Sequence, residues 1–385
     1  MFDKQKLNLR IARLKAYFLA TRRRISKTLL MSKTDLYEKN NFSLSPSLSH
    51  RSSINNIKPK LSFLETSDRF QEFSEWQKIA REKLSEICGV QPIHIMESQS
   101  KIEESSLDKG LICEKYYLKT TAGYHIPVHL IFSNKVRIPK RAMICLQGTN
   151  SGAHLSLGKI REPADFERLQ NGADFALQAA EKGWLAVAIE QSCFGERREQ
   201  LLEKPSQDPC IDAANHALMI GNTLIGERVT DVNAVVDWLK NERLNKRFFF
   251  DTIVCLGHSS GGSTAMFSVA LNEKIDGVIA SGCIGYMRQT IMLRGNPSGQ
   301  NIVPGILKWF EMNDIIAMCA PRPTITISGV NDHIWPSSGM SEVCSSARLA
   351  FEKMGAEDKL CDISVLGKHK FYPEETWSAV EEIFS

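Results

Sequence analysis

The stretch TIVCLGHSSGG, residues 252–262, decides the fold of this chain. Its first five residues are apolar or β-branched, as expected of a buried strand, and the following residues to Leu271 favour a helix. Glycines at 257 and 261 flank Ser259 and allow the chain to turn abruptly from strand to helix. A serine at such a turn is strained and exposed at the carboxyl end of its strand. We therefore predict that Ser259 is a nucleophile and that the backbone N–H of Ser260 is one oxyanion donor.

A serine nucleophile requires a histidine base and an acid, which in this arrangement follow in the order serine, acid, histidine. Asp332 and His369 each come directly after an apolar run that predicts a strand near the C-terminus. Both side chains are therefore expected to converge on Ser259, with His369 taking the serine proton and Asp332 orienting the imidazole. Asp314 is the alternative acid.

The loop QGTNSG, residues 147–152, follows another apolar run, Ala142–Leu146. In this position the loop would supply the second oxyanion donor, and the backbone N–H of Thr149 is the candidate. His258 lies inside the strand-to-helix turn, and we expect it to pack beneath the turn rather than act as a base.

The sequence pattern over residues 61–385 predicts one α/β domain. Two or three opening β-type runs between Leu111 and Leu146 are followed by alternating strand and helix patterns up to Ile383. Such alternation predicts a mostly parallel central sheet covered by helices on both faces. A long insertion, residues 283–313, precedes the strand that leads to Asp332. We expect it to act as a lid, with Tyr286, Arg288 and Trp309 lining the substrate.

Residues 1–60 differ from this domain in charge. They hold 14 Lys and Arg against three acidic residues, a formal charge of +11, whereas the remainder carries −7 and the whole chain +4. Residues 5–31 have the periodicity of a basic amphipathic helix, and residues 40–60 are serine-rich and expected to form a linker, disordered in part. Residues 1–33 could contact an anionic membrane, dock on a partner, or target an organelle.

Charge and cysteine content exclude some classes of function. The net negative charge of residues 61–385 argues against nucleic-acid binding by this domain, because such binding needs a basic surface. The ten cysteines show neither a C-x-x-C pair nor zinc-ligand spacing, so we expect no metal site and a reduced, cytoplasmic protein. Arg197 and Arg228 could bind an acidic substrate, although Glu196 and Glu227 beside them suggest structural ion pairs.

Several further motifs occur in order along the chain: Gly195-Glu196-Arg197, residues 221–229, Pro304-Gly305-Ile306, Ala320-Pro321-Arg322-Pro323, Pro336 after Asp332, and Gly367-Lys368-His369-Lys370-Phe371. With the turn at Ser259, this set resembles the α/β-hydrolases, and among them the acetyl-xylan-esterase-like and dienelactone-hydrolase-like esterases. The resemblance extends from about residue 75 to the end. One departure is Gln147, where a histidine commonly precedes the oxyanion glycine.

The resemblance implies a serine esterase that works through an acyl-enzyme without a cofactor, and it favours acetylated carbohydrates as substrates. Acyl transfer to an alcohol would use the same acyl-enzyme, so the sequence leaves it open. A non-catalytic binding protein that retains the fold is a third possibility.

Overall fold

The computed structural model describes residues 46–66, 69–96, 100–134, 139–149, 152–241, 247–292 and 298–384. The helix predicted over residues 5–31, and the membrane contact predicted for residues 1–33, lie outside these ranges.

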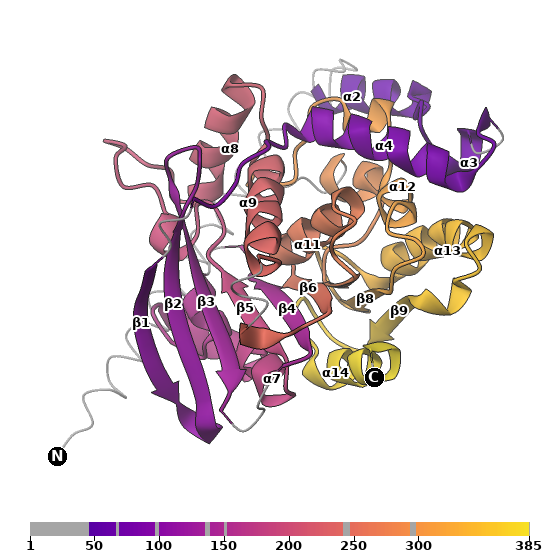
Figure 1. The fold of residues 1–385 in the computed structure, drawn as a ribbon. Coiled ribbons are helices and arrows are strands. Elements are labelled where there is room, and N and C mark those ends of the chain that lie inside the picture. The colour runs from indigo at the N-terminus through magenta and orange to yellow at the C-terminus, as the bar shows by residue number, and fades with distance from the viewer. Residues whose placement is uncertain are drawn as a thin grey trace.

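Within the described residues, nine strands form one sheet in the order β1-β2-β3-β5-β4-β6-β7-β8-β9 (Figure 1). The pairs β1–β2, β2–β3 and β3–β5 are antiparallel, and all pairs from β5 to β9 are parallel. The strands are β1 (Ser100–Leu107), β2 (Leu111–Lys119), β3 (His125–Ser133), β4 (Arg141–Leu146), β5 (Leu185–Ile189), β6 (Thr252–His258), β7 (Gly277–Ser281), β8 (Thr324–Gly329) and β9 (Leu360–Val365). The mostly parallel sheet predicted from the sequence is thus confirmed.

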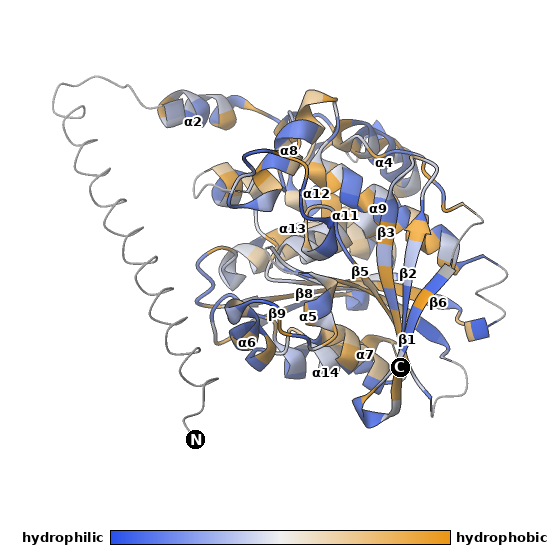
Figure 2. Cartoon of the chain, turned by 90° about the vertical axis from the view of Figure 1, so that its left-hand side faces the viewer, coloured by the Kyte–Doolittle hydropathy of each residue, from blue (hydrophilic) through white to orange (hydrophobic). Residues whose placement is uncertain are grey.

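Helices cover both faces of this sheet (Figure 1). They are α2 (Pro46–Asn56), α3 (Phe63–Thr66), α4 (Phe73–Cys88), α5 (Ala153–Ser156), α6 (Pro163–Gln170), α7 (Phe175–Glu181), α8 (Pro209–Met219), α9 (Leu224–Leu239), α11 (Ser260–Leu271), α12 (Met312–Ala317), α13 (Ser337–Lys353) and α14 (Pro373–Phe384). Adjacent residues of β4 belong to different layers: Ile144 is part of the core formed with α4, α9, α11, α12 and α13, and Met143 is part of the core formed with α7 and α14. The strands inside the sheet are apolar, as the colours of β5 and β8 show, whereas the outer helix α6 is mostly polar (Figure 2).

The N-terminal part of the described chain differs from its prediction. Residues 46–56, expected to belong to a linker, form helix α2 with Ile54 buried. The side chain of Arg288 donates to the carbonyl oxygens of Ile54, at 3.4 Å, and Ile57, at 2.9 Å, and so holds the end of α2 against the insertion. The serine-rich composition concealed this helix because its stability comes from these tertiary contacts rather than from local propensity.

The segment after α2 is fixed to the insertion by its backbone. Lys60 and Leu61 donate their N–H groups to the carbonyls of Lys308, at 2.9 Å, and Trp309, at 3.1 Å. Phe63 then donates to the carboxylate of Asp314 at 2.8 Å. Residues 46–63 are therefore part of the folded domain, although the sequence suggested a boundary at residue 60.

Helix α4 begins at Phe73, seven residues after Thr66. Thr66 ends the short helix α3, because its Oγ1 donates back to the carbonyl of Ser62 at 2.7 Å. Helix α4 is capped at its C-terminal end by Gly89, which lies in the left-handed region at φ 69°. No helix in the described ranges combines the length and apolar character needed to span a membrane.

Candidate active site

The strand-to-helix turn lies between β6 and α11, with Ser259 at φ 55° and ψ −121°. A non-glycine residue in this region is strained, which is typical of a serine held for chemistry. The flanking glycines have no room for a side chain. A Cβ at Gly257 would lie 2.2 Å from the carbonyl oxygen of Gly261, and a Cβ at Gly261 would lie 2.0 Å from that of Leu146. The tight turn therefore requires both glycines.

Three side chains from separate loops meet at this turn. The Nε2 of His369 lies 3.0 Å from the Oγ of Ser259, and its Nδ1 lies 2.6 Å from the Oδ2 of Asp332. Asp332 follows β8 and His369 follows β9, and these strands are parallel neighbours. The two loops are joined by the N–H of Asn331, which donates to the carbonyl of Gly367 at 2.8 Å. The structure thus brings together the three residues that the sequence selected.

The carboxylate of Asp332 is buried and held on both oxygens. Its Oδ1 accepts the backbone N–H groups of Ile334, at 2.8 Å, and Trp335, at 2.9 Å, which leaves Oδ2 for His369. Burial alone would raise the pKa of Asp332, but the hydrogen bond and charge of His369 and these two N–H groups outweigh it and lower the pKa. An ionised Asp332 accepts a hydrogen bond from the Nδ1–H of His369, which keeps the ring proton on Nδ1 and leaves Nε2 free to accept a proton from Ser259.

His258 packs beneath the turn, as predicted. Its ring lies 5.0 Å from that of His369, and its Nδ1 lies 3.1 Å from the hydroxyl of Ser281. Burial, and next the charge of His369, lower the pKa of His258 to about 3. It therefore stays neutral and adds no charge behind the base.

The predicted oxyanion loop lies against the serine. A Cβ at Gly148 would be 3.3 Å from the Cβ of Ser259, so a glycine at this position lets the loop approach. Gln147 uses its amide to hold the loop, donating to the hydroxyl of Ser156 at 2.5 Å and to the carbonyl of Ala173 at 2.8 Å. The glutamine that departs from the family pattern thus anchors the loop from behind.

The three predicted lining residues make their contacts elsewhere. The hydroxyl of Tyr286 lies 2.8 Å from that of Ser346 on α13, and Arg288 holds α2. The ring of Trp309 lies under the ammonium groups of Lys60, at 5.1 Å, and Lys83, at 4.6 Å. These side chains therefore tie the insertion to α13, to α2 and to the lysines at positions 60 and 83.

The alternative acid, Asp314, also has a structural place. Besides the N–H of Phe63, it accepts that of Glu311 at 2.8 Å, so it caps α12 and holds the N-terminal segment. The structure brings Asp332, not Asp314, to the imidazole.

Two polar residues beside the turn were missed as site residues. Arg228 is 1% exposed, and its Nη1 lies 2.7 Å from the hydroxyl of Ser260. Gln300, in the insertion, donates from Nε2 to the hydroxyl of Thr149 at 2.7 Å. Residues 221–229 drew attention to Arg228 as a possible substrate ligand or structural ion, but Gln300 belongs to no motif.

Of the two arginines, Arg197 forms a structural ion pair as expected, but not with the neighbouring Glu196. Arg197 pairs with Asp231 at 2.5 Å, and Glu196 pairs with Lys115 at 2.6 Å. For Arg228, none of the partners found in the described part of the chain is a carboxylate.

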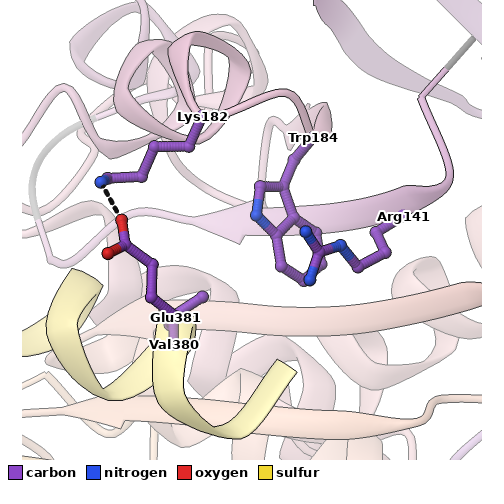
Figure 3. A pocket seen from close by; sticks show the side chains of 5 residues that line it. All are labelled: Arg141, Lys182, Trp184, Val380 and Glu381. Atoms are coloured by element: carbon purple, nitrogen blue, oxygen red, sulfur yellow. Dashed lines mark hydrogen bonds and ion pairs between the residues drawn. The ribbon is translucent and has the colours of Figure 1, made fainter. Parts of the chain in front are cut away.

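Two hollows lie away from the serine. One, with a volume of about 340 Å³, lies between α2 and the insertion and is lined by residues that include Ile54, Met287 and Val303. The other lies where β4 and β5 begin, between Arg141, Trp184 and Glu381 (Figure 3). The hollow is at the opposite edge of the sheet from Ser259, because it lies where strands begin and Ser259 follows the end of β6. Ligands of such folds bind at the carboxyl ends of the strands, on the side of Ser259. Over the described ranges, no group of three or more His, Cys, Asp or Glu could hold a metal ion.

A mostly parallel sheet with a serine at the turn after β6, and an acid and a histidine after β8 and β9, defines an α/β-hydrolase. The chain matches the abhydrolase family over residues 40–336, more than half of its length, and it belongs to that family.

The chain is similar, at low sequence identity, to proteins from other organisms. The Bacillus subtilis (strain 168) protein named "Putative hydrolase YtaP" is 21% identical over 250 residues, which cover 64% of this chain and 79% of that protein. Among solved structures, a protein from Bacteroides fragilis described as a putative acetyl xylan esterase has a TM-score of 0.64 and 20% identity, covering 84% of this chain and 82% of its own. A glucuronoyl esterase from Solibacter usitatus has a TM-score of 0.55 and 13% identity, covering 80% and 92%. At these identities the structures support the fold.

Proposed function

We propose that this protein is a serine hydrolase that cleaves carboxylic esters through a Ser259–His369–Asp332 triad and an acyl-enzyme. The observation that carries the proposal is the hydrogen-bonded chain from the Oγ of Ser259 through His369 to Asp332, at 3.0 and 2.6 Å. The two distances are those expected of a nucleophile bound to its base and of a base bound to the group that orients it.

In the acylation step, Ser259 Oγ attacks the ester carbonyl carbon while its proton moves to Nε2 of His369. The carbonyl oxygen becomes an oxyanion facing the backbone N–H groups of Ser260 and Thr149. His369 then gives the proton to the leaving alcohol, and the acyl group remains on Ser259. Water, activated by the same imidazole, releases the acid in the second half of the reaction.

Acetyl esters of carbohydrates are the substrates that we propose to test first. Support comes from the resemblance of the sequence motifs and from the descriptions of two structural neighbours, one as a putative acetyl xylan esterase and one as a glucuronoyl esterase. A panel of acetylated sugars and of p-nitrophenyl esters of increasing chain length would rank the acyl and alcohol parts.

The decisive experiment is the replacement Ser259→Ala, assayed on p-nitrophenyl acetate. Turnover should fall by several orders of magnitude, because the members of a triad act as a unit. Ser263→Ala removes a buried hydroxyl one turn further along α11 and should leave turnover near that of the wild type. Wild-type activity in Ser259→Ala, or labelling of that variant by a fluorophosphonate, would overturn the proposal.

The same probe separates the non-catalytic alternative, since a binding protein would leave Ser259 unlabelled. Acyl transfer is distinguished by product analysis with an added alcohol, which would yield a new ester in place of the free acid.

A further inference from the structure

Arg228, on α9, carries a buried charge directly behind the turn. Its Nη1 donates to the hydroxyl of Ser260 at 2.7 Å and to Oε1 of Gln300 at 3.2 Å, and its Nη2 donates to the carbonyl of Ser192 at 3.1 Å. Nη2 also lies 3.2 Å from the Sγ of Cys193 and 3.5 Å from that of Cys210, and none of these partners is a carboxylate. A buried charge is costly unless it is compensated, and here the hydroxyl of Ser260 is one of the groups that compensate it.

Gln300 extends this contact to the other side of the site. Its Oε1 accepts from the hydroxyl of Ser260 at 2.6 Å, and its Nε2 donates to Oγ1 of Thr149 at 2.7 Å. An arginine can only donate, so the amide oxygen must face Arg228 and the amide nitrogen must face Thr149. One buried amide thus links the two residues whose backbone N–H groups form the proposed oxyanion hole.

We infer that Arg228 and Gln300 are positioning residues, which fix the separation of the Ser260 and Thr149 donors and favour negative charge between them. The inference rests on the proposed function. Donors that are fixed before the reaction stabilise the oxyanion without reorganisation, and a misplacement of about 1 Å can cost about 100-fold in rate. The network acts on the transition state, so its loss should reduce kcat and leave KM nearly unchanged.

Thr149 offers the cleanest test. Thr149→Val keeps the branched shape and the backbone N–H but removes the acceptor of Gln300, whereas Thr149→Ser keeps the hydroxyl. We expect kcat on p-nitrophenyl acetate to fall about 10- to 100-fold in the valine variant, and the conservative serine variant to recover most of this loss. The kcat of Gln300→Met and of Arg228→Met should fall by a similar factor, and Arg228→Lys should recover part of that loss.

The control is Cys193→Ser. The Sγ of Cys193 lies 3.2 Å from Nη2 of Arg228, whereas Ser260 and Gln300 are bound by Nη1. This variant changes one contact of the same guanidinium but leaves the link to the oxyanion donors intact, so kcat should remain near the wild-type value.

A trifluoromethyl ketone gives a readout that a purely structural role would not move. Ser259 Oγ adds to its carbonyl carbon and the proton passes to His369, which leaves an oxyanion between the two donors. In Thr149→Val and Gln300→Met, affinity for this inhibitor should fall in parallel with kcat/KM.

The inference is overturned if Thr149→Val and Gln300→Met keep wild-type kcat, if the loss appears in KM alone, or if Cys193→Ser loses as much as Arg228→Met. If the inference fails in one of these ways while Ser259→Ala is inactive, the proposed function still stands. If Ser259→Ala is active, the proposed function itself is overturned. Should Arg228→Met fail to fold, the variants of Thr149 and Gln300 decide the question.

Discussion

Replacing Asp332 with asparagine should reduce kcat about 10⁴-fold, and the hydrogen bonds of this side chain give the reason. Its Oδ1 accepts two backbone N–H groups, from Ile334 and Trp335, so an asparagine must keep its oxygen in that place. The NH₂ group then faces Nδ1 of His369, where Oδ2 lies at 2.6 Å in the wild type. Nδ1 must accept, the ring proton moves to Nε2, and Nε2 can no longer take the proton of Ser259.

A 10⁴-fold loss corresponds to about 5.4 kcal/mol of transition-state stabilisation, at about 1.36 kcal/mol for each factor of ten. The assay is kcat and KM on p-nitrophenyl acetate, with thermal unfolding to verify the fold. Asp251→Asn, which removes an exposed carboxylate before β6, is the control for the loss of one charge. If Asp332→Asn folds and keeps more than about a tenth of wild-type kcat, Asp332 does not set the tautomer of His369 and the reasoning is refuted.

Other predictions concern stability and thiol exposure. Burial, and next the charge of Lys115, lower the pKa of His129 from 6.5 to about 4. Between these two pH values the imidazole is protonated in the unfolded chain but neutral in the folded protein, so the free energy of unfolding falls as the pH drops from 6.5 toward 4. His129→Leu should lessen that fall in urea unfolding at pH 7 and pH 5, and an unchanged difference would contradict this account. Gly226→Ala would stabilise an exposed helix by up to about 1 kcal/mol, but here its Cβ would lie 1.9 Å from the carbonyl oxygen of Cys88, so the melting temperature should fall rather than rise. All ten cysteines are free and only Cys361 is not buried, so Ellman's reagent should titrate about one thiol quickly in the native protein and ten after unfolding.

The turn at Ser259 could be predicted because its requirements are local. An apolar strand, two glycines without room for a Cβ, and a helix lie within 20 residues of one another. Asp332 and His369 could be predicted for a related reason, since each follows a short apolar run and parallel strands bring such positions to one edge.

The network behind the turn could not be predicted from such patterns. Gln300 lies in a long connecting segment, and only the tertiary structure brings it to Thr149, 151 residues away. Glu227 and Arg228 are consecutive on α9, and consecutive helical residues do not face each other, so adjacency in sequence was a poor guide to ion pairing.

Strand β1 was missed because its sequence SKIEESSL is largely polar. As an edge strand paired only with β2, it buries little apolar surface and leaves no hydrophobic alternation to detect.

The attachment of the N-terminal segment to the insertion has a consequence for synthesis on the ribosome. Phe63 and Asp314 are 251 residues apart, so at about 5–20 residues per second the acceptor is made about 13–50 s after the donor. For most of that interval residues 46–66 have none of the insertion to bind, and the N–H of Phe63 has no carboxylate of Asp314 to donate to. The first part of the described chain to be made is therefore among the last to reach its final place, and a nascent chain stalled before residue 288 should leave it accessible to protease.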